Sequence, residues 1–167
     1  MDIHVITATR HGSTREIGAA IAARLRDRGR AVAEHDAEDR IDLGAGEPVV
    51  LGSPLYFGKW LKATRSWVEQ LGAEPARGRP LWLFTAGQLG DPPQPADAKP
   101  EEEVLALVAS HANDHRMFTG KLDRADLGLR ERIALKAVDP PEGDFRDWDA
   151  IAAWADEIFA TLERSDP

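Results

Sequence analysis

Five short segments with strand-like composition recur along this chain, and they constrain the fold because helical patterns or polar connections separate them. They cover residues 3–7, 31–36, 48–53, 79–85 and 115–120. After the first segment, Ile17, Ile21 and Leu25 return every four residues, as on one face of a helix. Strands that alternate with helices predict an α/β fold, in which a doubly wound, five-stranded parallel sheet lies between two helical layers.

The later part of the chain is predicted from the same periodicities. The stretch 91–100 is rich in proline, so we expect a surface loop with no helix or strand. Residues 122–138 scatter apolar positions among charged ones and predict short helical pieces packed on the fold. The clearest helical pattern covers 148–162, and Asp144 and Asp147 are candidate caps for it.

Composition bounds both the architecture and the chemistry. The chain has 167 residues, of which 43% are hydrophobic, so we expect a single domain over 1–167. It contains no cysteine, which excludes disulfides, thiolate nucleophiles and cysteine-ligated metals, so any redox chemistry must come from a cofactor. Lys and Arg number 21 against 29 Asp and Glu, and the formal charge of −8 argues against nucleic-acid binding, although ordinary solubility charge also explains it. The start is unlike a signal peptide and no apolar run approaches about 20 residues, so we expect a cytoplasmic protein with no transmembrane segment.

A short loop between the first predicted strand and the first predicted helix is a candidate phosphate site. It consists of Thr9, Arg10, His11, Gly12, Ser13 and Thr14. The first N–H groups of a helix have no intrahelical partners and carry the positive end of its dipole, so they attract an anion. The hydroxyl groups would add donors, and Gly12 would let the backbone approach closely. Alternatively, Ser13 and Glu16 form a capping box that needs no ligand.

Two further loops are predicted at the same edge, since the carboxyl ends of parallel strands meet there and bind ligands. The second loop consists of Ser53, Pro54, Leu55, Tyr56, Phe57 and Gly58. The third loop consists of Thr85, Ala86, Gly87, Gln88 and Gly90. Tyr56 is the best candidate to face a flat ligand, whereas Phe57 and Trp60 could instead pack on the following helix. The glycines of the third loop would let amides approach a heterocycle and Gln88 could bind its edge, with a plain glycine turn as the alternative.

Histidines offer no convincing metal site. His111 and His115 are four residues apart, but a predicted helix end and strand start separate them. His4 and His35 fall in strand patterns, where satisfied structural side chains are expected. We therefore predict no bound metal.

Three motifs together resemble the flavodoxin-like FMN proteins over nearly the whole chain. T-R-H-G-S-T-R-E is similar to the phosphate loop of that family, G-S-P-L-Y-F-G to its second flavin loop and T-A-G-Q-L-G to its third. The resemblance implies a flavodoxin-like sheet of order 2-1-3-4-5 with FMN as the cofactor. By position, it implies that Thr9 to Thr14 hold the phosphate, that Ser53 to Gly58 border the ring, and that Thr85 to Gly90 contact its pyrimidine side.

Within this family, the chain is most similar to the menaquinone-dependent protoporphyrinogen oxidases of the flavodoxin type. The likeness rests on the T-R-x-G-x-T-R-E-I start, an aromatic pair ahead of a glycine, and a segment inserted before the last helix with its D-W pair. It implies an FMN-dependent oxidoreductase that passes electrons from a small reduced substrate to a quinone or another acceptor. The mixed charges of 121–138 are not typical of a basic amphipathic helix, so they do not support peripheral membrane contact. His11 and Gln88 depart from the family, which commonly has a small hydroxyl residue and an acidic residue at these positions.

Two other functions remain open. The chain could be an electron carrier between redox partner proteins that turns over no small molecule. It could also be an interaction domain that keeps the fold without the flavin. The sequence contains neither G-x-x-x-x-G-K-[ST] nor G-x-G-x-x-G, so nucleotide P-loops and dinucleotide sites are excluded. It indicates nothing about the oligomeric state.

Overall fold

Five parallel strands form the central sheet in the order β2-β1-β3-β4-β5, as the sequence predicted. The computed structural model describes residues 2–74, 78–93, 98–136 and 139–165. The strands are β1 (Ile3–Thr7), β2 (Val32–Asp36), β3 (Val49–Pro54), β4 (Leu81–Gln88) and β5 (Asp114–Thr119). All five residues of β1 are buried, whereas most of β2 is only partly buried, because β1 lies inside the sheet and β2 at its edge.

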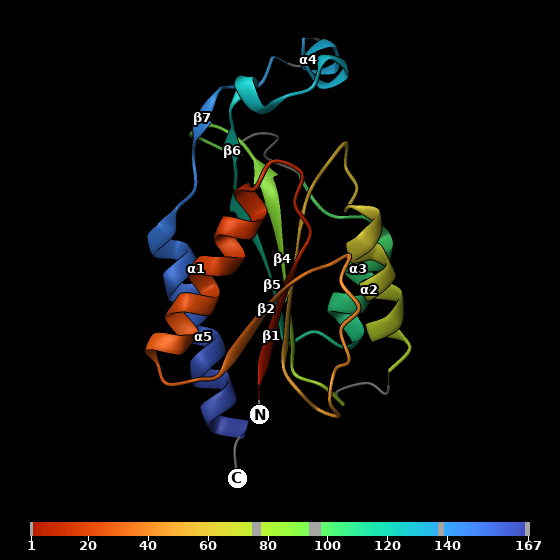
Figure 1. Ribbon diagram of the computed structural model, residues 1–167, viewed down its shortest axis with the longest axis vertical. Helices are drawn as coiled ribbons and strands as arrows, with labels where there is room; N and C mark the ends of the chain where they lie inside the picture. Colours follow the sequence, from red (N-terminus) through yellow and green to blue (C-terminus); the bar gives the residue numbers. More distant parts are fainter. Residues whose placement is uncertain (1, 75–77, 94–97, 137–138, 166–167) are drawn as a thin grey trace.

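Helices cover both faces of the sheet (Figure 1). One face carries α1 (Ser13–Asp27) and α5 (Trp148–Ser165), and the other carries α2 (Lys62–Gly72) and α3 (Glu102–Ser110). A separate apolar core lies on each side, so the sheet is sandwiched as expected. None of the helices in the described part of the chain is long and apolar enough to cross a bilayer.

Three large aromatic rings pack against one another on the α5 side of the sheet. Trp154 of α5 is 2% exposed and packs edge-on against Phe84 at 6.2 Å and Phe118 at 5.6 Å between ring centroids. Its indole N–H donates to a carboxylate oxygen of Asp114 at 2.8 Å. Gly52 on β3 leaves the room that the Phe84 ring needs, since a Cβ there would lie 2.1 Å from the ring. The core on this side therefore depends on close aromatic contacts.

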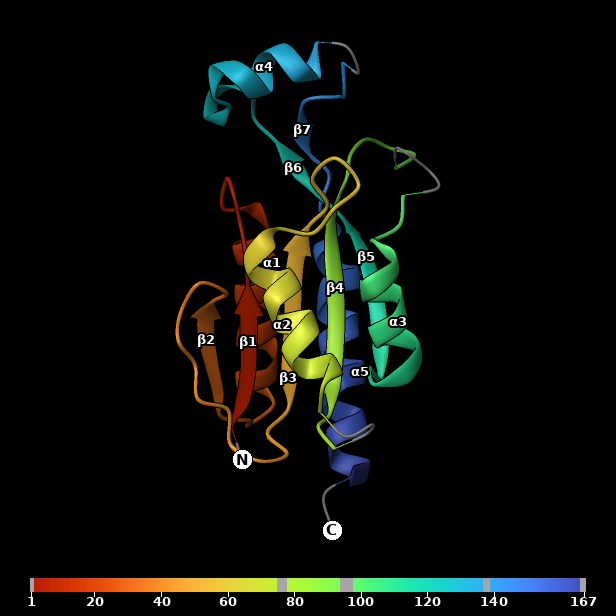
Figure 2. The same ribbon diagram turned by 90° about the vertical axis from the view of Figure 1, so that its right-hand side faces the viewer.

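Residues 120–145, here called the insertion, stand beyond the carboxyl edge of the sheet (Figure 2). The insertion contains β6 (Lys121–Leu122), the 3-10 helix η1 (Arg124–Asp126), α4 (Leu129–Leu135) and β7 (Gly143–Asp144). β6 and β7 pair in antiparallel fashion as a small second sheet. The predicted helical pieces are confirmed over the described residues of 122–138, with 137–138 lying outside them, but Leu129 and Ile133 of α4 are exposed and do not pack on the fold as predicted. The small sheet was not predicted. Strands of two residues are too short to show an alternating pattern.

Helix caps and connections agree with most of the predictions. Asp147 caps α5, because its carboxylate accepts from the backbone N–H of Ala150 at 2.9 Å. Asp144 does not cap this helix and instead pairs with Arg146. In the proline-rich stretch 91–100, the described residues 91–93 and 98–100 form no helix or strand, and 94–97 lie outside the described part.

A hydrogen-bonded histidine pair joins the edge strand to the sheet. His4 Nδ1 lies 2.9 Å from Nε2 of His35, and its Nε2 lies 2.9 Å from a carboxylate oxygen of Glu47. The two rings stack with their centroids 5.1 Å apart. The prediction that these histidines are satisfied side chains is confirmed. The hydrogen bond from His4 lowers the pKa of Glu47, so this carboxylate stays ionised and holds the connection before β3 against β1.

We expect the free energy of unfolding to fall as the pH is lowered from about 7.5 to about 5.5. Burial, followed by the neighbouring His4, lowers the pKa of His35 below its usual 6.5, so the folded protein resists a proton that the unfolded chain accepts. The contribution of neutral His35 to the free energy of unfolding is therefore complete above pH 6.5 and is lost as the pH falls below this value. Urea unfolding across this range should show a shallower decline for His35→Gln. Some decline should remain, because burial also lowers the pKa of His115.

His111→Gln is the matched control for this pH series. His111 is the C-cap residue of α3 and contacts Ser110 and Glu74 rather than either member of the pair, so its replacement removes a histidine and leaves the pair intact. A His35→Gln protein whose stability declines as steeply as that of the native protein would contradict the assignment.

Candidate functional site

The three predicted loops lie together at the carboxyl edge of neighbouring strands. Loop 1 (9–14) follows β1, loop 2 (53–58) ends β3, and loop 3 (85–90) ends β4. The guanidinium carbon of Arg10 lies 4.7 Å from the ring centroid of Tyr56, which joins loop 1 to loop 2. The backbone N–H of Leu55 donates to the carbonyl of Ala86 at 2.7 Å, which joins loop 2 to loop 3. The edge therefore offers one continuous site.

Loop 1 opens α1 without a side-chain cap. Gly12 is the N-cap residue, with a φ of 89° that favours glycine, and its N–H donates to the hydroxyl of Thr9 at 2.9 Å. The predicted capping box does not form, because Ser13 lies inside the helix and the carboxylate of Glu16 pairs with Arg146. The first N–H groups of α1 thus stay available to an anion.

The hydroxyl of Thr14, at the start of α1, has no hydrogen-bond partner among the described residues. Thr14 is only 2% exposed. Yet within the described chain every buried side-chain oxygen and nitrogen has a partner, so this oxygen must be reachable from outside. A Cβ at Gly12 would meet nothing nearer than an oxygen of Glu16 at 3.9 Å, so the loop also has room for a ligand. Loop 1 therefore fits a phosphate.

Loop 2 ends in a tight turn that exposes an aromatic ring. The backbones of Tyr56 and Lys59 exchange hydrogen bonds of 2.8 and 3.0 Å around Phe57 and Gly58. Phe57 has a φ of 50°, unusual for a bulky residue, and its side chain is 74% exposed, so it does not pack on the following helix. Trp60 does pack there, since it is 2% exposed.

Loop 3 is a continuation of β4, which runs to Gln88 and is longer than the predicted strand. Pairing with β5 is irregular between Ala86 and Gln88, where Gly87 has a φ of 153°. A Cβ at Gly87 would lie 3.2 Å from the backbone of Leu55, so glycine permits the close approach of loops 2 and 3. This glycine does more than form a plain turn.

Two predicted hydroxyl residues point into the protein. Ser53 is fully buried, and its hydroxyl oxygen accepts from the backbone N–H of Leu61 at 3.1 Å. Thr85 is also fully buried, and its hydroxyl accepts from the indole N–H of Trp60 at 2.9 Å. The structure therefore places both side chains where they hold loops 2 and 3 in position.

Glu131, in the first turn of α4, reaches the site from the insertion. Its Oε1 lies 2.7 Å from Nε of Arg10, 3.2 Å from Nε2 of His11 and 2.5 Å from the hydroxyl of Tyr56. The hydrogen bond from Tyr56 contributes most to lowering the pKa of Glu131 to about 2, so it is ionised at neutral pH. Burial and this same bond raise the pKa of Tyr56 to about 12, so the phenol remains a donor.

Arg146 secures the return of the insertion to the fold. Its side chain is 4% exposed and forms ion pairs of 2.5 Å with Glu16 of α1 and Asp144 of β7. Its guanidinium also lies 4.4 Å from the ring centroid of Trp148. Neither Glu131 nor Arg146 was predicted, because each stands among other charges and contacts the loops or α1 through partners that are far away in the sequence.

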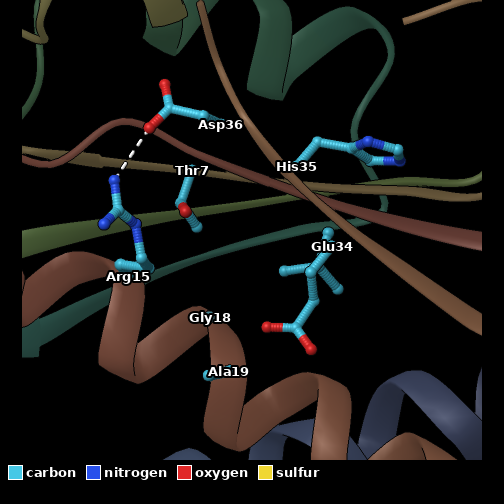
Figure 3. Close-up of a pocket in the computed structure, with 8 residues that line it drawn as sticks. Thr7, Arg15, Gly18, Ala19, Glu34, His35 and Asp36 are labelled. Carbon is cyan, nitrogen blue, oxygen red and sulfur yellow. Dashed lines mark hydrogen bonds and ion pairs between the residues drawn. The ribbon is translucent and has the colours of Figure 1, made fainter. Parts of the chain in front are cut away.

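A cavity of about 160 Å³ lies outside the three loops, between α1 and β2 (Figure 3). Thr7, Gly18 and Glu34 line it, as do Arg15 and Asp36, which form an ion pair of 2.9 Å. Such a volume suits small molecules or water rather than a three-ring cofactor. The cavity is therefore too small for the flat ligand predicted for this protein.

A family model described as a flavodoxin domain matches residues 4–149. The chain belongs to the flavodoxin family. FMN is the cofactor of flavodoxins, so the predicted cofactor is confirmed at the level of the family. Flavodoxins transfer electrons to redox partner proteins.

Solved flavodoxin structures share this fold at low sequence identity. The flavodoxin from Streptococcus pneumoniae TIGR4 superposes with a TM-score of 0.61 and 15% identity, covering 96% of this chain and 99% of that chain. Flavodoxin 1 from Bacillus cereus gives 0.60 and 11%, with 96% and 98% covered. The rubredoxin oxygen:oxidoreductase from Desulfovibrio gigas gives 0.63 and 12%, over 98% of this chain and 36% of that chain. No curated protein matches the chain.

Proposed function

We propose that this flavodoxin is an FMN-dependent oxidoreductase that takes electrons from a small reduced substrate and passes them to a quinone or another acceptor. The observation that carries the proposal is the insertion, whose Glu131 contacts both loop 1 and loop 2. A segment that lies over the flavin edge suits a substrate that must be enclosed, because closure excludes water from the reacting atoms. The motif likeness to protoporphyrinogen oxidases suggests a reduced tetrapyrrole as substrate, and the cytoplasm as the compartment is part of the same proposal.

The three loops divide the work of holding the cofactor in this proposal. Loop 1 binds the phosphate through the first N–H groups of α1 and the hydroxyls of Ser13 and Thr14. Loop 2 presents Tyr56 or Phe57 to the ring, and the amides of loop 3 meet its polar edge. Bound FMN supplies the redox chemistry, while the residues of this chain bind it, orient it and limit access to it.

An electron carrier is the second candidate. Three large apolar side chains are exposed on loop 2 and α4, namely Phe57, Leu129 and Ile133 at 74%, 77% and 60%. Exposed apolar groups beside a redox centre suit brief docking of a partner protein, because such contacts are small. The carrier would need no enclosed substrate.

Anaerobic mixing separates the two candidates. The FMN-loaded protein is combined with protoporphyrinogen at a molar excess of flavin, because porphyrin formation removes more electrons than one FMN accepts, and flavin absorbance and porphyrin fluorescence are followed together. The enzyme should lose flavin absorbance and form porphyrin faster than free FMN does. A protein that stays oxidised with this substrate, yet is reduced by a flavodoxin reductase in two one-electron stages, would favour the carrier. A protein that binds no FMN would instead support a flavin-free interaction domain.

A further inference from the structure

The carboxylate of Glu131 occupies a ready-made anion site that belongs to the loops. One oxygen is shared by Arg10, His11 and the hydroxyl of Tyr56, and the other accepts from the backbone N–H of Gly128 at 2.9 Å. The side chain of Glu131 is only 11% exposed, whereas that of Arg10 is 50% exposed. The acid therefore reaches in from the insertion toward cations that are open to solvent.

The contacts of Glu131 join α4 to loops 1 and 2. Leu129 and Ile133 lie one turn apart on this helix, and both are exposed, so neither side chain packs against the body of the protein. Within the described residues, the hydrogen bonds and ion pairs of Glu131 join α4 to loops 1 and 2. A helix that is joined to the loops through an ion cluster can be released from them by an anion that competes for the same donors.

Phosphate and carboxylate compete for such donors directly. Arg10 and His11 are the two cationic or ionisable side chains of loop 1, next to the N–H groups that the proposed phosphate would use. The phosphate of FMN carries more charge than a carboxylate and has three acceptor oxygens. Riboflavin has the same ring but no phosphate, so it does not compete with Glu131 for Arg10.

We propose that Glu131 determines how strongly this site prefers a phosphorylated flavin, because its carboxylate holds Arg10 and His11 until the FMN phosphate displaces it. The inference rests on the proposed binding of the phosphate at loop 1. In the flavin-free protein, Glu131 keeps the insertion against the loops. Binding of FMN breaks these contacts and frees α4 to move away from the loops, whereas binding of riboflavin leaves α4 in place.

The test compares the native protein with Glu131→Gln, which keeps a hydrogen-bond acceptor for Tyr56 but removes the competing charge. FMN should bind about fivefold more tightly to the variant, since a partly exposed ion pair is lost from the competing state. Riboflavin should bind equally to both proteins. Both affinities follow from quenching of flavin fluorescence. Asp126→Asn is the control, because it removes a charge from the same insertion. The carboxylate of Asp126 makes no ion pair with any described residue.

Three results would overturn the proposal: weaker FMN binding by Glu131→Gln, unchanged FMN binding, or an equal gain for riboflavin. Weaker FMN binding by the variant would indicate that Glu131 stabilises the bound flavin. If neither protein binds any flavin, the proposed function fails, and titration with inorganic phosphate decides the present inference separately. NMR signals of the His11 ring should then respond to phosphate at lower concentration in Glu131→Gln than in the native protein, and equal responses would contradict it.

Discussion

The double variant Ser13→Ala/Thr14→Val should bind FMN about a hundredfold more weakly than the native protein and bind riboflavin with unchanged affinity. Each hydroxyl bond to a charged phosphate contributes about 1.5 kcal/mol, so two of them amount to about 3 kcal/mol. The fold should tolerate the change, because valine has nearly the shape of threonine and no described residue depends on the Thr14 hydroxyl. Fluorescence titrations with the two flavins measure the difference.

Ser66→Ala/Thr161→Val is the matched control for this variant. Ser66 and Thr161 lie on α2 and α5, where each hydroxyl donates to a carbonyl one turn earlier in its own helix. This control should bind both flavins as the native protein does. Equal losses of FMN and riboflavin in the loop 1 variant would mean that the ring site, and not the phosphate site, had been disturbed.

Trp154→Ala should lower the free energy of unfolding by about 4 kcal/mol, a large part of the stability of a domain of this size. The substitution opens a void between Phe84 and Phe118 that the sheet cannot close, because β4 is held by strands on both sides. It also removes the indole N–H that donates to Asp114. Urea unfolding followed by circular dichroism avoids any dependence on tryptophan fluorescence.

Trp148→Ala tests the same residue type on the same helix at an exposed position. Trp148 is 43% exposed and its ring lies beside the guanidinium of Arg146. We expect its loss to cost less than about 1 kcal/mol, since little area leaves the interior. Similar losses in the two variants would show that the aromatic cluster around Trp154 is not the main stabilising contact of α5.

The sheet was predictable because its strands are marked by local composition. β3 reads as an unbroken apolar run, Val49 to Leu51, which is typical of a strand buried on both faces. The end of β4 was placed too early because Ala86 and Gly87 resemble a turn, and only the neighbouring strands show that pairing continues to Gln88. Strand ends of this kind depend on partners that are distant in the sequence.

The site was predictable in its loops and not in its electrostatics. The fragment from Ser13 to Glu16 matches a capping box. Arg146, which lies 130 residues away from Glu16 in the sequence, binds the Glu16 carboxylate instead, so the capping box does not form. Glu131 looks like one charge among several on a short helix, and its role arises because the insertion brings it to His11, 120 residues distant. Local patterns cannot contain such information, since these ion pairs exist only once the sheet and the insertion have formed.

Mapping amide NMR shifts while FMN is added to the protein tests the central claim, that three loops at one sheet edge hold the flavin. The account predicts large shifts in residues 9–14, 53–58 and 85–90, with smaller ones in the insertion, and saturation at one FMN for each chain. Shifts confined to the cavity between α1 and β2, or no shifts at any FMN concentration, would contradict it.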